Sequence, residues 1–215
     1  KVFNQNTINE INLFKVILRD YLRNSINFND RKYYWVRSGM EFYYLEKYIQ
    51  KYHADSELIG SLSNIFLIKN HQISNEKMSE IFNISQLYIK RLRLDQKISE
   101  PSNNLTRINY RLVNPAKSLN AFKLLELYDE DLIHKTFKIL LNDQLLFKNN
   151  DQLKDVFKRN TSENLDWFFD HYINFSELLD YKIEINKNKV SILDKSKEKI
   201  QIPIPIKKVF KNYKF

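Results

Sequence analysis

The spacing of apolar residues changes once along this chain, and that change most constrains its fold. From Ile8 to about Tyr172, apolar side chains recur every three or four positions, which is typical of amphipathic helices that bury one face. After Asp180 apolar and polar residues alternate one by one, which indicates β-strands. The pattern predicts a mainly α-helical fold, with a helical domain over residues 1–176. Residues 177–215 form a β-strand segment that could begin a further β domain.

The expected helices are delimited by their apolar stripes and by residues that favour helix ends. Thr7 and Glu10 have the spacing of a capping box, so the first helix is expected to begin there. Asp55 or Ser56 is expected to cap the third helix. We expect helices over residues 8–22, 35–52, 58–66, 75–92, 115–128, 131–141, 151–159 and 162–172.

Three alternating runs predict strands over residues 181–185, 190–192 and 200–206. Lys187-Asn188 is expected to form the turn between the first two runs. The last run contains two prolines, which confine it to a sheet edge because each proline removes a hydrogen-bond donor. Three strands with one apolar face are hardly stable alone, so we expect them to pack on the helices or on further strands.

Composition narrows the possible chemistry. The chain has no Cys, which excludes disulfides, Cys-ligated zinc and thiol nucleophiles within it. Its four His show no i, i+4 pair of the kind that places two imidazoles on one helical face. Apolar runs are only a few residues long, far short of the ~20 that a helix needs to cross a bilayer. The sequence therefore predicts no metal, no small-molecule cofactor and no membrane segment.

The net charge of +9 raises nucleic-acid binding as an alternative function, since clustered Lys and Arg bind phosphates. The chain is also rich in Lys, Asn, Ile, Phe and Tyr and poor in Gly, which is typical of an AT-rich genome. Its one dense basic run, residues 90–93, ends an expected helix, where the helix dipole favours cations. The charge alone therefore does not predict a nucleic-acid partner.

Three segments carry a resemblance to a known family. The first is Tyr34-Trp35-Val36-Arg37-Ser38-Gly39-Met40 with the aromatic helix that follows it. The second covers residues 109–125, and the third covers residues 164–173 with Asp180-Tyr181. In this order they resemble the second half of the catalytic region in gluzincin (aminopeptidase N-type) metallopeptidases, over roughly residues 8–206. The resemblance implies a helical fold similar to the C-terminal half of that catalytic domain, followed by a small β segment.

The resemblance also implies which residues stand at the family's zinc site. The family's H-E-x-x-H motif, which supplies two zinc ligands and the general base, would fall on residues 15–19. Lys15 and Arg19 take the two His positions, Val16 takes the base position, and Ser38 takes the place of the ligand glutamate. Ala116 stands at the position of the tyrosine that stabilises the oxyanion.

These replacements imply that the peptidase chemistry is lost. Charged Lys and Arg offer no lone pair to a metal, and Val16 cannot take a proton from a zinc-bound water. The resemblance therefore implies a catalytically inactive metallopeptidase-like domain that serves as a scaffold or binds a protein or peptide. It also implies a bacterial periplasmic or cell-surface location. Lys15 and Arg19, one turn apart, are expected to line the former cleft and attract an anion such as a peptide carboxylate.

Other readings of the same segments stay open. The large aromatic residues at helical spacing are expected to be structural, because such rings bury much area whatever the ancestry. They are Trp35, Tyr43, Tyr44, Trp167, Phe168 and Phe169. Gly39-Met40-Glu41 is similar to the family's substrate-amine motif but lies at the wrong place relative to the zinc helix. The chain could instead be a fragment of an active zinc aminopeptidase whose H-E-x-x-H helix lies outside it, or a basic helical nucleic-acid-binding domain.

Overall fold

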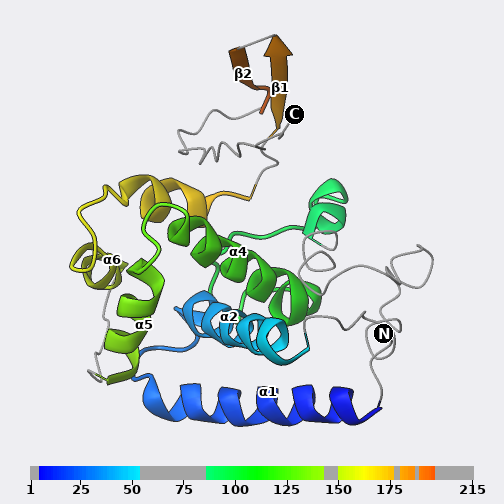
Figure 1. Cartoon of the computed structure of the whole chain (residues 1–215), viewed down its shortest axis with the longest axis vertical. Helices are drawn as coiled ribbons and strands as arrows, with labels where there is room; N and C mark the ends of the chain where they lie inside the picture. The colour runs from blue at the N-terminus through cyan, green and yellow to red at the C-terminus, as the bar shows by residue number, and fades with distance from the viewer. Residues whose placement is uncertain (1–4, 54–85, 143–149, 177–179, 187–188, 197–215) are drawn as a thin grey trace, which may run out of the picture.

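The computed structural model describes residues 5–53, 86–142, 150–176, 180–186 and 189–196 (Figure 1). Within these residues the chain is mainly helical, and a small antiparallel sheet of two strands follows the helices, as the change of apolar period predicted. The helices are α1 (Gln5–Ser25), α2 (Tyr34–Tyr52), α4 (Asn114–Glu126), α5 (Leu132–Asn142) and α6 (Asn150–Lys158). Shorter helical pieces are residues 86–91, the π-helical turns Asn109–Val113 and Trp167–His171, and the 3-10 turn Tyr172–Asn174. The strands are β1 (Tyr181–Asn186) and β2 (Lys189–Asp194).

Helix α2 lies between α1 and α4 and has packed neighbours on both sides (Figure 1). It packs tightly on α4 at Gly39, where a Cβ atom would stand 2.5 Å from Cε2 of Phe122 and 2.8 Å from Cβ of Ser118. Both distances are far inside van der Waals contact, so any side chain at Gly39 would push the two helices apart. The missing side chain at this position therefore sets the spacing of the central helix pair.

An aromatic core surrounds Phe122, the residue of α4 that faces Gly39. The Phe122 ring lies 5.6 Å from Trp35 of α2, 5.0 Å from Phe137 of α5 and 6.4 Å from Phe157 of α6, measured between ring centroids. Phe168 extends the cluster, 6.3 Å from Trp35. All five rings are buried, and burying each contributes roughly 1.5–3 kcal/mol to folding. One side chain thus joins four helices into a single core.

Most helix predictions within the described residues are confirmed to within a few positions, and two are wrong. The predicted capping box at Thr7 is wrong, because α1 already includes Gln5, two residues upstream. The predicted helix over residues 162–172 begins only at Asp166, whose backbone N–H donates to the side chain of Asn164 at 2.8 Å. That side-chain bond satisfies a free N–H at the first residue of the helix, which explains why the helix begins at Asp166 and not at Ser162.

Some predictions lie outside the described residues. These are the helix over 58–66 with its cap at Asp55 or Ser56, most of the helix over 75–92, and the strand over 200–206. Within the described ranges, no helix has both the length and the apolar character required to cross a membrane.

Strands β1 and β2 form an antiparallel hairpin with a register that runs from Tyr181 opposite Asp194 to Asn186 opposite Lys189. Its base is closed by the backbone of Asp180, whose carbonyl accepts from the N–H of Lys195 at 2.6 Å. The apolar residues of the hairpin are largely exposed in the described part of the chain, with Ile185 at 73%. The described hairpin by itself therefore contributes little apolar burial.

The contact at Gly39 leads to a stability prediction. Gly39→Ala should destabilise the protein by about 1–3 kcal/mol, since overpacking against Phe122 and Ser118 outweighs the helix propensity that alanine adds. Urea unfolding followed by circular dichroism measures the change. Gln50→Ala, at an exposed position of the same helix, is the control and should shift stability by less than about 0.5 kcal/mol. A Gly39→Ala protein more stable than wild type would contradict the close packing of α2 on α4.

Candidate functional site

The first cluster of charged residues lies between α1 and α2. Arg19 of α1 donates to Glu41 of α2 through Nε to Oε2 at 3.1 Å and through Nη2 to Oε1 at 2.6 Å. The Glu41 side chain is only 4% exposed, and Nη1 of Arg37 lies 3.9 Å from its Oε2. Arg37 also forms a two-pronged pair with Asp30, with Nη2 donating to Oδ2 at 2.8 Å. Two guanidinium groups thus compensate one buried carboxylate.

Lys15 lies one turn before Arg19 and packs on the same side of α2. Its Nζ is 5.3 Å from the centre of the Phe42 ring, within the range of a cation–π interaction. Burial lowers the pKa of Lys15, the Glu41 carboxylate opposes that shift, and the positive charge of Arg19 adds to it. The guanidinium group of Arg19 already holds a carboxylate, and the anion site expected at Lys15 and Arg19 stays a prediction.

The other three positions of the former zinc site lie in different surroundings. Ser38 is buried, and its hydroxyl donates to the carbonyl of Trp35 at 3.4 Å. Ala116 is buried in α4, whereas Val16 is 63% exposed. None of the five positions lines either of the two cavities described below. Glu41, which was given no role in the sequence, is the residue that organises this region.

The first cavity is an open groove of about 480 Å³ between α1, α2 and α5, here called the aromatic groove. Its walls are mostly aromatic and aliphatic: Phe14, Leu18, Tyr21, Tyr44, Tyr48, Tyr52 and Leu141. The rings of Phe14 and Tyr48 stack with centroids 4.0 Å apart. The Tyr48 hydroxyl also donates to Glu10, so the stacked pair is held from both helices. The groove therefore has mostly apolar walls, in which the Phe14–Tyr48 pair is held in place.

Two lysines of α2 add positive charge to the aromatic groove. Lys47 lies 5.1 Å from the ring centre of Tyr43 and 3.8 Å from a carboxylate oxygen of Glu126. Lys51 lies 5.0 Å from the ring centre of Tyr52. Across the residues that the structure describes, no carboxylate pairs with Lys51. The groove is therefore apolar along its walls and basic along one side.

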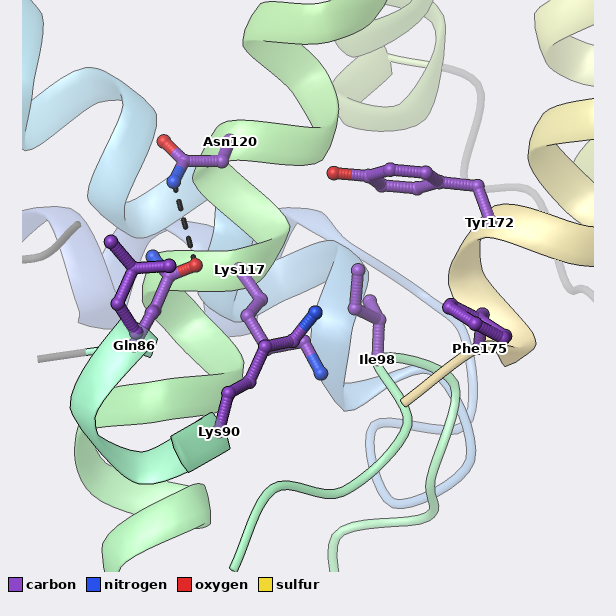
Figure 2. A pocket seen from close by; sticks show the side chains of 8 residues that line it. Gln86, Lys90, Ile98, Lys117, Asn120, Tyr172 and Phe175 are labelled. Carbon is purple, nitrogen blue, oxygen red and sulfur yellow. Dashed lines mark hydrogen bonds between the residues drawn. The ribbon is translucent and has the colours of Figure 1, made fainter. Parts of the chain in front are cut away.

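The second cavity, here called the lysine pocket, has a volume of about 270 Å³ and lies between residues 86–91, α4 and residues 172–175 (Figure 2). Lys117 of α4 forms part of its wall and makes a buried ion pair with Asp95. Its Nζ donates to both Asp95 oxygens at 2.9 Å and to the carbonyl of Gln96 at 2.6 Å. Burial lowers the pKa of Lys117 to about 8, Asp95 opposes this, and the charge of Lys90 adds to it.

A sharp turn brings Asp95 to Lys117. Arg93 has a φ of 56°, the left-handed conformation that usually requires glycine. The N–H of Leu94 donates to the carbonyl of Ile89 at 3.2 Å, and the N–H of Arg93 donates to that of Lys90 at 2.9 Å. These two bonds form a Schellman motif, which ends the helical piece 86–91. The chain then turns back, so that Asp95 meets α4.

Comparison with known proteins adds no relative. No protein-family model matches the chain, and neither a curated protein nor a solved structure matches it. No group of three or more His, Cys, Asp or Glu suited to hold a metal ion occurs among the described residues. The gluzincin resemblance therefore depends on the three sequence segments alone and is a proposal for this chain.

The buried ion pair leads to a stability prediction. Asp95→Asn should destabilise the protein by about 3 kcal/mol, because it leaves the Lys117 ammonium buried without its carboxylate. Urea unfolding at pH 7 measures the loss. The control is Asp131→Asn, which removes an exposed i, i+4 partner of Lys135 and should cause no measurable loss. Equal stability of the two variants would show that the Asp95–Lys117 pair does not stabilise the fold.

Proposed function

We propose that this chain is a catalytically inactive metallopeptidase-like domain that binds a peptide segment of a protein partner. The observation that carries the proposal is the aromatic groove between α1, α2 and α5, with Lys47 and Lys51 on one side. Tyrosines that are already held in position make good anchors for a partner, because they bury a large area at a low cost in side-chain entropy.

The side chains of α1 support the inactive part of the proposal. Under the gluzincin resemblance, Lys15 and Arg19 replace zinc ligands, and they contact Phe42 and Glu41. Val16, at the base position, is exposed and could not act on a group held between α1 and α2. Lys15 and Arg19, which take the ligand positions, therefore pack on Phe42 and pair with Glu41 instead.

The outer surface of α1 supports the binding part. Three apolar residues there, Leu13, Val16 and Ile17, are each more than half exposed, and Tyr21 next to them also lines the groove. Apolar residues that gather on one helix face and continue into a groove are typical of interaction surfaces. The groove and the α1 surface thus form one candidate binding area.

The charge of the groove indicates the kind of peptide. Lys51 has no carboxylate partner in the described part of the chain, and the whole chain carries a net charge of +9. An acidic segment would be attracted to this side and would pair with Lys51. The occupant we propose is therefore a peptide with aromatic or aliphatic anchors flanked by Glu or Asp.

Two fluorescent peptides test this binding. Each has the same Leu and Phe anchors, flanked in one by Glu and in the other by Lys. The Glu peptide should bind more tightly by fluorescence anisotropy, and Lys51→Glu should weaken it by about tenfold through charge repulsion. Tyr52→Ser, which removes an exposed groove ring, should weaken both peptides.

The control is Arg159→Glu, which makes the same charge change at an exposed site at the end of α6. It should leave the affinity for the Glu peptide close to that of wild type. If Lys51→Glu and Arg159→Glu lose the same affinity, the Glu peptide is attracted by the net charge of the chain and not by the groove. If neither peptide binds the wild-type protein, the proposed function is wrong.

Zinc binding separates this proposal from the alternative of an active aminopeptidase. The purified full chain should hold no stoichiometric zinc after dialysis against zinc-containing buffer and should not hydrolyse aminoacyl-arylamides, because Lys15, Arg19 and Ser38 stand at the ligand positions. Elemental analysis and a chromogenic assay measure the two properties. About one zinc per chain, removable by a chelator, would refute the proposal that the domain is catalytically inactive.

A further inference from the structure

An exposed tyrosine in the π-helical turn Asn109–Val113 has one face of its ring covered. The ring of Tyr110 stacks on the ring of Tyr34, with centroids 4.5 Å apart and 16° between the ring planes. Tyr34 is buried, whereas Tyr110 is 38% exposed, and no second ring stacks on Tyr110 among the described residues. Because the stack covers one face of the Tyr110 ring, the exposed area of the ring lies on its other face and its edge.

The ring that supports Tyr110 is itself held in place. The Tyr34 hydroxyl donates to the carbonyl of Tyr110 at 2.7 Å, and the guanidinium carbon of Arg37 lies 5.6 Å from the ring centre of Tyr34. Arg37 is fixed in turn by its ion pairs with Asp30 and Glu41. Tyr110 is therefore a preorganised stacking surface, and a flat group that stacks on it causes little further loss of side-chain entropy.

Two exposed arginines stand beside Tyr110 on the same helical segment. Arg107 and Arg111 are three positions before Tyr110 and one position after it, and the two arginines are four positions apart. Residues three and four positions apart lie on one side of a helix. Within the described ranges, no carboxylate pairs with either arginine. Both guanidinium groups can therefore accept an anion next to the Tyr110 ring.

A third exposed arginine comes from the left-handed turn described above. The side-chain amide of Asn109 donates to the carbonyl of Leu94 at 2.8 Å, which ties this turn to the π-helical turn and brings Arg93 beside it. Residues 86–113 contain six basic and two acidic residues, and Asp95, one of the two acids, is already held in a buried ion pair. The surroundings of Tyr110 are therefore positively charged.

We propose that Arg93, Arg107, Tyr110 and Arg111, here called the arginine face, bind single-stranded nucleic acid. A base stacks on the exposed face of Tyr110, and the neighbouring phosphates pair with the guanidinium groups. The supported ring favours a nucleic acid over an acidic peptide, because carboxylate side chains pair with arginine but have no flat ring to stack. This surface shares no residue with the aromatic groove, so it would serve a second partner and does not rest on the proposed peptide binding.

Two fluorescent probes of equal length separate base stacking from charge. One is a short oligothymidylate, and the other is an abasic oligodeoxynucleotide with the same phosphates and no bases. In fluorescence anisotropy with the full chain, the oligothymidylate should bind about tenfold more tightly, because only its bases stack. Tyr110→Ser should remove this advantage and leave the abasic probe unchanged. Tyr110→Phe keeps the ring and should bind both probes as wild type does.

The arginines are tested through the salt dependence of binding. Arg107→Gln and Arg111→Gln should each weaken both probes. Each should also reduce the slope of log affinity against log salt concentration by about 0.7, the contribution of one phosphate contact to a single strand. The control is Arg159→Gln, which removes an exposed arginine at the end of α6 and should leave the affinity and the slope close to wild type.

Three results would overturn the proposal. The first is no saturable binding of oligothymidylate, and the second is equal affinity of the wild-type protein for the two probes, a comparison that depends on no variant. The third is polyglutamate that binds as tightly as oligothymidylate and displaces it, which would assign the arginine face to an acidic protein. The peptide proposal is tested with Lys51→Glu and Tyr52→Ser in the aromatic groove, so either proposal can fail without the other.

Discussion

The rest of the structure depends on the close approach of α2 to α4 at Gly39. With no side chain there, Phe122 lies directly against α2 and carries the aromatic core outward to α5 and α6. Helix α1 then covers the other side of α2. A helix enclosed on both sides must bury whatever its sequence contains, and the sequence of α2 contains charged residues as well as apolar ones.

Those buried charges are paired in every case that the structure describes on α2. Glu41 lies between Arg19 and Arg37, and Glu46 accepts from Lys123 of α4 at 2.9 Å. The pairs connect α2 to both neighbouring helices, so they favour one alignment of the three helices over others. Breaking one pair would leave a charge without a partner in a poorly solvated place, which is far more costly than losing an exposed pair.

The local features of the fold could be predicted from the sequence, and its pairings could not. The apolar period depends on neighbouring residues, which is why most helices and the hairpin were placed within a few positions. The Arg19–Glu41 and Lys117–Asp95 pairs each join residues 22 positions apart, and no local pattern connects them. The i, i+4 spacing of Arg37 and Glu41 was a signal that could have found one contact of the first cluster. The lysine pocket joins four separate segments, so its lining could not be read from any one of them.

The left-handed turn at Arg93 has a consequence for how readily the lysine pocket can be occupied. This turn ties the end of the helical piece that carries Lys90 to Asp95, and Asp95 is in turn held by Lys117 of α4. Two walls of the pocket are therefore joined by a short, hydrogen-bonded length of chain. A cavity held open in this way is preorganised, and filling it costs little of the conformational entropy that a loose loop would lose.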